Sequence, residues 1–115
     1  MAKLKLRINK DSSIDEIEEA IEDVLNCGQR EIELNQVIKI VNALGGEILK
    51  GKKGGKGSQA RFRHPDLALY YTYYQDGQFG VHVIHAGKAN KKVRIRDFKG
   101  CCLPALRKII EIKRN

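Results

Sequence analysis

Hydrophobic and polar residues alternate at the start of the chain. From Lys3 to Asn9, the apolar residues Leu4, Leu6 and Ile8 are separated by basic residues. A period of two is typical of a strand with one buried face. The pattern therefore predicts a half-buried strand at Lys3–Asn9.

The apolar period then changes from two to the three- and four-residue spacing of a helix. Ser13 and Glu16 form the S-x-x-E pattern of a capping box, which predicts that this helix begins at Ser13. Gly28 stands where a C-cap is expected. The apolar face consists of Ile14, Ile17, Ile21, Val24 and Leu25.

A second helix is expected after a short extended stretch at Glu31–Leu34. Asn35 is a candidate N-cap, and Gly45 and Gly46 predict where the helix ends. The residues expected to face the core are Val37, Ile38, Val41 and Leu44.

Strand-like runs fill the middle of the chain, and each is bounded by turn residues. His64-Pro65-Asp66 and Asp76-Gly77 are expected to form two of the turns, the second being a strong hairpin signal. The predicted strands are Glu47–Lys50, Ser58–His64, Leu67–Tyr74 and Phe79–His85, with a short extended piece at Val93–Arg96.

The chain closes with a third predicted helix. Pro104 suits its first turn, and Leu103, Leu106, Ile109 and Ile110 give it an apolar face. The whole order predicts an α+β fold, with an antiparallel sheet of three or more strands and helices packed on one face. A length of 115 residues suggests a single domain spanning residues 1–115.

Composition narrows the class of protein. No apolar run is long enough to cross a bilayer, and the N-terminus lacks the apolar stretch of a signal peptide. Cys27, Cys101 and Cys102 are an odd set with two neighbours, which suits neither a disulfide framework nor a metal site. We therefore expect a reduced, cytoplasmic protein with no membrane contact, no metal and no cofactor.

Charge is distributed unevenly. The formal net charge is +8, but residues 1–46 carry six basic and nine acidic residues, whereas residues 47–115 carry sixteen basic and five acidic ones. A field this strong attracts polyanions, of which nucleic acid is the commonest in the cytosol, although a basic surface can also serve only solubility.

A run of glycines and lysines between Leu49 and Ser58 carries the candidate chemistry. It differs from a phosphate-binding P-loop, because a glycine separates Lys56 from Ser58 and a strand pattern follows instead of a helix. We expect Lys52, Lys53 and Lys56 to contact a sugar-phosphate backbone, the alternative being a solvated hairpin tip.

The strand that follows is expected to extend this basic surface. Strand alternation places Gln59, Arg61 and Arg63 on one face, and Ala60, Phe62 and His64 on the other. The first set predicts an open, nucleic-acid-binding face and the second a core face.

Two further patterns leave alternatives open. The acidic residues Glu18, Glu19, Glu22 and Asp23 can form a solvated helix face, or can cover a basic surface of the protein itself or of a partner. Tyr70, Tyr71, Tyr73 and Tyr74 can pack in the core or stack on bases.

The order of short motifs from Asn35 to Lys113 resembles the HicA-type toxins, also called the YcfA-like family. That family has K-G-S-H at a strand start, an F-x-H-P turn, P-x-H near the last strand and L-R-x-I in a closing helix. The matching residues here are Lys56-Gly57-Ser58-Gln59, Phe62-Arg63-His64-Pro65, His85 and Leu106-Arg107-Lys108-Ile109.

The resemblance implies a fold like that of double-stranded-RNA-binding domains, with a helix, three strands and a helix in residues 35–115. It also implies cleavage of messenger RNA and neutralisation by a HicB-type antitoxin. Residues 1–34, a strand and an acidic helix, are an N-terminal extension that the family pattern lacks.

This chain differs from the HicA-type family at the position of the family's catalytic residue. The family's catalytic histidine follows Gly-Ser, and here Gln59 follows Ser58. A glutamine amide can bind RNA but cannot exchange a proton near neutral pH, as histidine can. His82 or His85 is the candidate replacement, although His85 lacks the family's preceding proline.

The sequence thus favours an RNA-binding protein with a HicA-like core, for which double-stranded RNA is one candidate ligand. Two alternatives stay open. One is an active ribonuclease of a toxin–antitoxin pair that uses His85 or His82, and the other is a non-enzymatic module that binds proteins.

Overall fold

The structure is a computed structural model that describes residues 4–49, 59–70, 74–85 and 91–115. Helices pack against antiparallel sheets, so the predicted α+β class is confirmed. The elements are α1 (Ile14–Leu25), β1 (Glu31–Glu33), α2 (Leu34–Ala43), β2 (Glu47–Leu49), β3 (Gln59–Arg63), β4 (Gln78–His82), β5 (Ile84–His85), β6 (Lys91–Arg94), α3 (Ile95–Asp97) and α4 (Leu103–Arg114).

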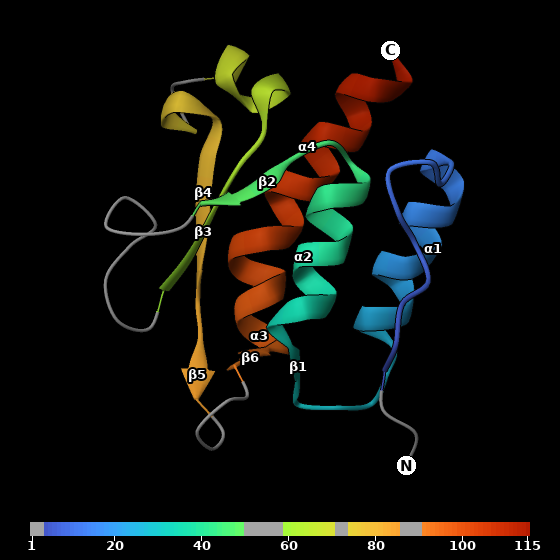
Figure 1. Cartoon of the computed structure of the whole chain (residues 1–115), viewed down its shortest axis with the longest axis vertical. Coiled ribbons are helices and arrows are strands. Elements are labelled where there is room, and N and C mark those ends of the chain that lie inside the picture. The colour runs from blue at the N-terminus through green and yellow to red at the C-terminus, as the bar shows by residue number, and fades with distance from the viewer. Residues whose placement is uncertain (1–3, 50–58, 71–73, 86–90) are drawn as a thin grey trace.

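Two three-stranded antiparallel sheets share one long stretch of chain. The first has the order β2-β3-β4 and the second the order β1-β6-β5, and only Val83 separates β4 from β5. Figure 1 shows β3 and β4 at the left, α2 and α4 in the middle and α1 at the right. The predicted order of helix, three strands and helix is present as α2, β2, β3, β4 and α4, with β5, β6 and α3 inserted between β4 and α4.

The first helix begins as the sequence predicts. The Ser13 hydroxyl accepts a hydrogen bond from the Glu16 backbone N–H at 3.1 Å, and the Glu16 carboxylate accepts one from the Ser13 N–H at 2.8 Å. Two of the backbone N–H donors at this helix end, those of Ser13 and Glu16, are therefore satisfied. The N-cap predicted for the second helix is wrong, because α2 begins at Leu34, so Asn35 lies inside the helix and does not cap it.

The predicted strand at Lys3–Asn9 is wrong for the part that the structure describes, because residues 4–9 join no sheet. The alternation is real: Leu6 is buried, and its neighbours Lys5 and Arg7 are exposed. The backbone N–H and carbonyl of Leu6 form hydrogen bonds with side chains of α2 instead of with a neighbouring strand. Gln36 Oε1 accepts from the Leu6 N–H at 2.8 Å, and Lys39 Nζ donates to the Leu6 carbonyl at 3.1 Å.

The predicted strand at Leu67–Tyr74 is also wrong where it is described. Pro65–Tyr70 forms a 3₁₀ helix. His64 stabilises this 3₁₀ helix through two hydrogen bonds. Its Nδ1 accepts one from the Asp66 N–H at 3.0 Å, and its carbonyl accepts one from the Leu67 N–H at 3.1 Å. Both bonds continue the turn and keep the chain from extending.

The closing helix begins earlier than its apolar pattern predicts. Strand β6 ends at Arg94, and α3 and a π-helical turn, Phe98–Cys102, lead directly into α4. The expected extended piece at Val93–Arg96 is therefore right only for its first half. Leu106, Ile109 and Ile110 are buried as expected, and Pro104 lies in the first turn of α4. None of the helices in the described ranges has the length and apolarity needed to cross a bilayer.

His64 is a structural residue that ties α2 to the turn after β3. Its side chain is 1% exposed, and its Nε2 donates to the Leu44 carbonyl at 2.6 Å. Because the Asp66 N–H donates to Nδ1, the ring is the neutral tautomer with its proton on Nε2. The expectation that His64 faces the core is confirmed.

Candidate nucleic-acid interface

The outer face of the β2-β3-β4 sheet brings the candidate residues of β3 and β4 together. In the β3–β4 ladder, Gln59 pairs with His82, Arg61 with Gly80, and Arg63 with Gln78. Directly paired residues share a face, so all six lie on the side opposite the core. The alternate residues Ala60, Phe62, Phe79 and Val81 are buried, with the two phenylalanine ring centroids 5.3 Å apart.

Arg61 is the central cation of this face. Gly80 stands across from it, and a Cβ on Gly80 would lie 3.2 Å from Arg61 Nη1, so the guanidinium lies over the bare backbone of β4. Its Nε donates to Gln78 Oε1 at 3.4 Å. Within the described residues Arg61 has no acidic partner, so its charge is available to an anion.

Arg63 differs from Arg61 because it has an acidic partner. Its Nη2 lies 3.2 Å from Asp76 Oδ1, and its Nε donates to the Asp76 carbonyl at 3.1 Å. The two side chains are 43% and 59% exposed, so the pair contributes little to stability, but it reduces the positive potential at this end of β3. Of the two arginines that the sequence predicts as phosphate ligands, Arg63 has an acidic partner, and Arg61 has none among the described residues.

His82 is the histidine that reaches the same face as Gln59. It is exposed and is the direct cross-strand partner of Gln59, which is also exposed. The imidazole therefore stands one strand away from the position that the resemblance identifies as catalytic. His85 pairs with Lys91 in the second sheet, and its side chain is not among those that the structure describes.

Several predicted residues lie outside the described residues. They include the phosphate candidates Lys52, Lys53 and Lys56, which belong to the segment that joins β2 to β3, and the tyrosines Tyr71 and Tyr73. Among the tyrosines, the side chain of Tyr74 is described, and it is half-buried against the core.

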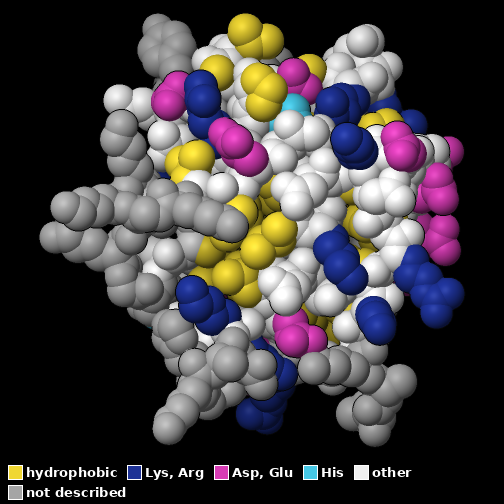
Figure 2. Space-filling view, in the orientation of Figure 1, with side chains coloured by type: hydrophobic (Ala, Val, Ile, Leu, Met, Phe, Trp, Pro, Cys, Tyr) yellow, Lys and Arg dark blue, Asp and Glu magenta, His cyan; other side chains and the backbone are white. Residues whose placement is uncertain are grey.

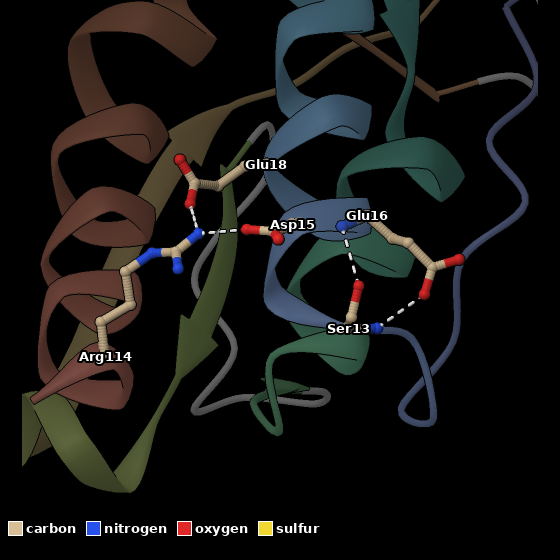
Figure 3. A network of polar contacts seen from close by, with 5 residues as sticks. All are labelled: Ser13, Asp15, Glu16, Glu18 and Arg114. Atoms are coloured by element: carbon tan, nitrogen blue, oxygen red, sulfur yellow. Dashed lines mark hydrogen bonds and ion pairs between the residues drawn. The ribbon is translucent and has the colours of Figure 1, made fainter.

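Ion pairs join the acidic face of α1 to the basic face of α4. Arg114 contacts both Asp15 and Glu18, the first with its Nη2 2.7 Å from Asp15 Oδ1 (Figure 3). Arg107 Nη2 lies 3.5 Å from Glu22 Oε1. The hydrogen bond that Arg114 donates to Asp15 is the main cause that raises the pKa of Arg114, followed by the hydrogen bond that it donates to Glu18.

These contacts decide between the alternatives for the acidic helix. Part of its charge covers the protein's own basic surface, and that surface is α4 and not the β2-β3-β4 sheet. Figure 2 shows acidic side chains gathered along the edge where α1 lies in Figure 1. The cations of α4 are thereby partly neutralised, whereas Arg61 on the sheet is not.

The cysteines are free thiols with different surroundings. Cys101 is exposed and Cys102 is buried in the core. Burial is the largest cause that raises the pKa of Cys102 to about 12, with neighbouring Cys101 and Asp97 adding to it. No cluster of three or more metal-binding side chains occurs in the parts of the chain that the structure describes.

This difference gives a prediction for thiol reactivity. A pKa of about 12 leaves Cys102 with roughly a thousandfold less thiolate at pH 8 than an ordinary cysteine, and the thiolate is the reactive form. Cys102 should therefore react about a thousandfold more slowly than Cys101 with an aromatic disulfide reagent. Rates measured on the double variants Cys27→Ser/Cys101→Ser and Cys27→Ser/Cys102→Ser, which each keep one thiol, check this, and comparable rates for the two thiols would contradict it.

Comparison with known proteins gives no match to a family model, to a curated protein or to a solved structure. The site must therefore be interpreted from its own geometry. Sequence reasoning missed Gly80 and Gln78, which place and orient Arg61. No local signal indicates them, because residues 64–77 join β3 to β4, and the predicted hairpin residues Asp76-Gly77 lie in a 3₁₀ turn, Gln75–Gly77, instead of a two-residue hairpin.

Proposed function

We propose that this protein binds RNA on the outer face of the β2-β3-β4 sheet. Arg61 is the principal phosphate ligand, with Gln59 and His82 beside it as hydrogen-bonding groups. Arg63, at the end of β3, and the lysines Lys52, Lys53 and Lys56, which precede β3 in the sequence, are the further phosphate candidates. The resemblance to HicA-type toxins supports RNA as the ligand, and a HicB-type antitoxin as a protein partner.

One observation carries the proposal. Arg61 is partly exposed on the outer strand face, its guanidinium lies over Gly80, and it has no acidic partner among the described residues. A guanidinium in such a position can donate two parallel hydrogen bonds to a phosphate. Its neighbours Gln59 and His82 can donate to and accept from 2′-hydroxyl groups, which distinguish RNA from DNA.

Binding measured across a range of salt concentrations tests this proposal. The probes are an RNA duplex of about 16 base pairs, the length that one double-stranded-RNA-binding domain spans, its single strands and the DNA duplex of the same sequence. Arg61→Ala should weaken RNA binding severalfold and lower the slope of log affinity against log salt by about one, because one phosphate contact is lost.

The matched control is Arg107→Ala, which removes the same charge from α4, where Arg107 already pairs with Glu22. It should change the salt slope little. Equal effects of Arg61→Ala and Arg107→Ala would mean that net charge alone drives binding, and the proposed site would be wrong.

A specific observation also favours a second candidate function, RNA cleavage. His82 stands opposite Gln59 on the open face, so a proton-transfer group lies beside the position of the family's catalytic histidine. His82 would take the proton from a 2′-hydroxyl as its oxygen bonds to the adjacent phosphorus, the P–O5′ bond breaks, and the leaving 5′-oxygen takes a proton from water. Incubation of a long RNA with the parent protein, His82→Ala and His85→Ala tests this role. Intact RNA with the parent protein excludes the activity, and loss of cleavage only in His85→Ala assigns the role to His85.

A further inference from the structure

A basic groove lies at the junction of β1, β6 and the start of the closing helix. It is an open depression with a volume of about 720 Å³. That volume is in the range of ligand-binding pockets. Its lining residues are Arg30, Glu31, Arg94, Ile95, Arg96 and Lys99.

Pairing between β1 and β6 builds this groove from distant parts of the chain. Glu31 pairs with Arg94, and the Ile95 N–H donates to the Arg30 carbonyl at 2.8 Å. These bonds hold Arg30 of the N-terminal extension beside Arg94. Lys99, in the π-helical turn that follows α3, completes the wall.

The groove is strongly cationic. Four basic side chains and one acidic side chain line it, and all four basic residues are exposed. In the described ranges Arg30, Arg94 and Lys99 make no ion pair, and Arg96 contacts Asp97 only at 3.9 Å with 80% of its side chain exposed. Surface charges of the two signs are usually interspersed, so this concentration of unpaired positive charge favours an anionic ligand.

The groove also lies near the sheet that carries the proposed RNA-binding face. In the second sheet Ile84 pairs with Lys92 and His85 with Lys91. Only Val83 separates β5 from β4, and β4 and β6 are in contact. Strand β6, which ends at the groove residue Arg94, therefore lies beside the strand that carries His82.

We propose that this groove is a second anion site that binds backbone phosphates of the same RNA. The inference rests on the proposed function, because the sheet face holds one stretch of the ligand and the groove a neighbouring stretch. A nucleic-acid backbone fits the site better than a single carboxylate, because it carries a charge at every successive phosphate and the groove is lined by four basic side chains. The N-terminal extension would thus enlarge the RNA-binding surface by contributing Arg30.

The test uses the full chain and the same RNA duplex. The double variant Arg96→Ala/Lys99→Ala removes two groove charges without altering a sheet position. We expect about a tenfold loss of affinity near 0.1 M salt, and a salt slope lower by about two. The single variant Arg94→Ala should lower the slope by about one.

The matched control is Arg107→Ala/Lys108→Ala, which removes two charges from α4, where both residues pair with glutamates. Thermal unfolding of every variant shows whether it is folded. If Arg94→Ala disturbs β6, the double variant Arg96→Ala/Lys99→Ala still tests the groove, because neither of its residues belongs to a strand.

The outcomes separate the two proposals. If Arg61→Ala weakens binding and the groove variants match the α4 control, the groove proposal is wrong and the sheet proposal stands. If neither set weakens binding, the proposed function is wrong. If the groove variants alone weaken binding, RNA binds at the groove and the sheet face is not its site.

Discussion

Replacing His64 with alanine is expected to lower the free energy of unfolding by about 4 kcal/mol. The imidazole is 1% exposed, so its removal leaves a cavity among core side chains. It also leaves the Leu44 carbonyl without its donor at 2.6 Å and the Asp66 N–H without its acceptor at 3.0 Å. Each buried polar group left unpaired adds to the cost of the cavity.

Urea denaturation of the variant and the parent protein measures this loss. His82→Ala is the matched control, because it removes the same side chain from an exposed strand position, where the expected change is within about 0.5 kcal/mol. Similar losses in the two variants would show that His64 does not hold α2 to the turn after β3.

Replacing Gly77 with alanine is expected to cost about 3 kcal/mol or more. The first reason is conformation, because Gly77 has φ +72°, a left-handed region that L-residues adopt at a cost. The second is space. A Cβ at Gly77 would lie 2.3 Å from the His64 carbonyl oxygen and 3.2 Å from the Ala68 nitrogen, and both atoms belong to the backbone, so the turn itself would have to move.

The same substitution at Gly28 distinguishes the conformational cost from the steric cost. It has nearly the same conformation, with φ +75°, but a Cβ there would meet nothing within 4 Å. Gly28→Ala should therefore cost only the conformational part, about 1 kcal/mol. Thermal or urea unfolding of both variants gives the difference, and equal losses would contradict the close approach between Gly77 and His64.

Much of the fold could be predicted because its determinants are local. The capping box at Ser13 and Glu16, the apolar period of α1 and the glycines after α2 each act within a few residues. The core face of β3 followed from alternation alone. These features need no knowledge of the partner element.

The errors arose where a distant partner decides the structure. Leu4–Asn9 has the pattern of a strand, but Gln36 and Lys39 of α2 satisfy its backbone in place of a neighbouring strand. Residues 67–70 have strand-like composition, but the His64 side chain and carbonyl hold the chain in a 3₁₀ turn. The contacts of His64 with Asp66 and Leu67 are local, but the His64 ring is held by the Leu44 carbonyl of a distant part of the chain, which no local pattern shows.

The candidate site was predictable only in part. Alternation placed Gln59, Arg61 and Arg63 on one face, but the pairing of Arg63 with Asp76 depends on the turn before β4. The choice of His82 over His85 as the neighbour of Gln59 required the strand register. The groove containing Arg30 and Arg94 depends on pairing between β1 and β6, which no local signal indicates.

The most direct test of the proposed RNA-binding face is a titration of the ¹⁵N-labelled protein with the same RNA duplex, followed by amide chemical shifts. The proposal predicts progressive shifts in β3 and β4, largest at Gln59, Arg61 and His82, with the amides of α1 unchanged. Shifts confined to α1 and α4, or no shifts at protein concentrations up to the millimolar range, would contradict it.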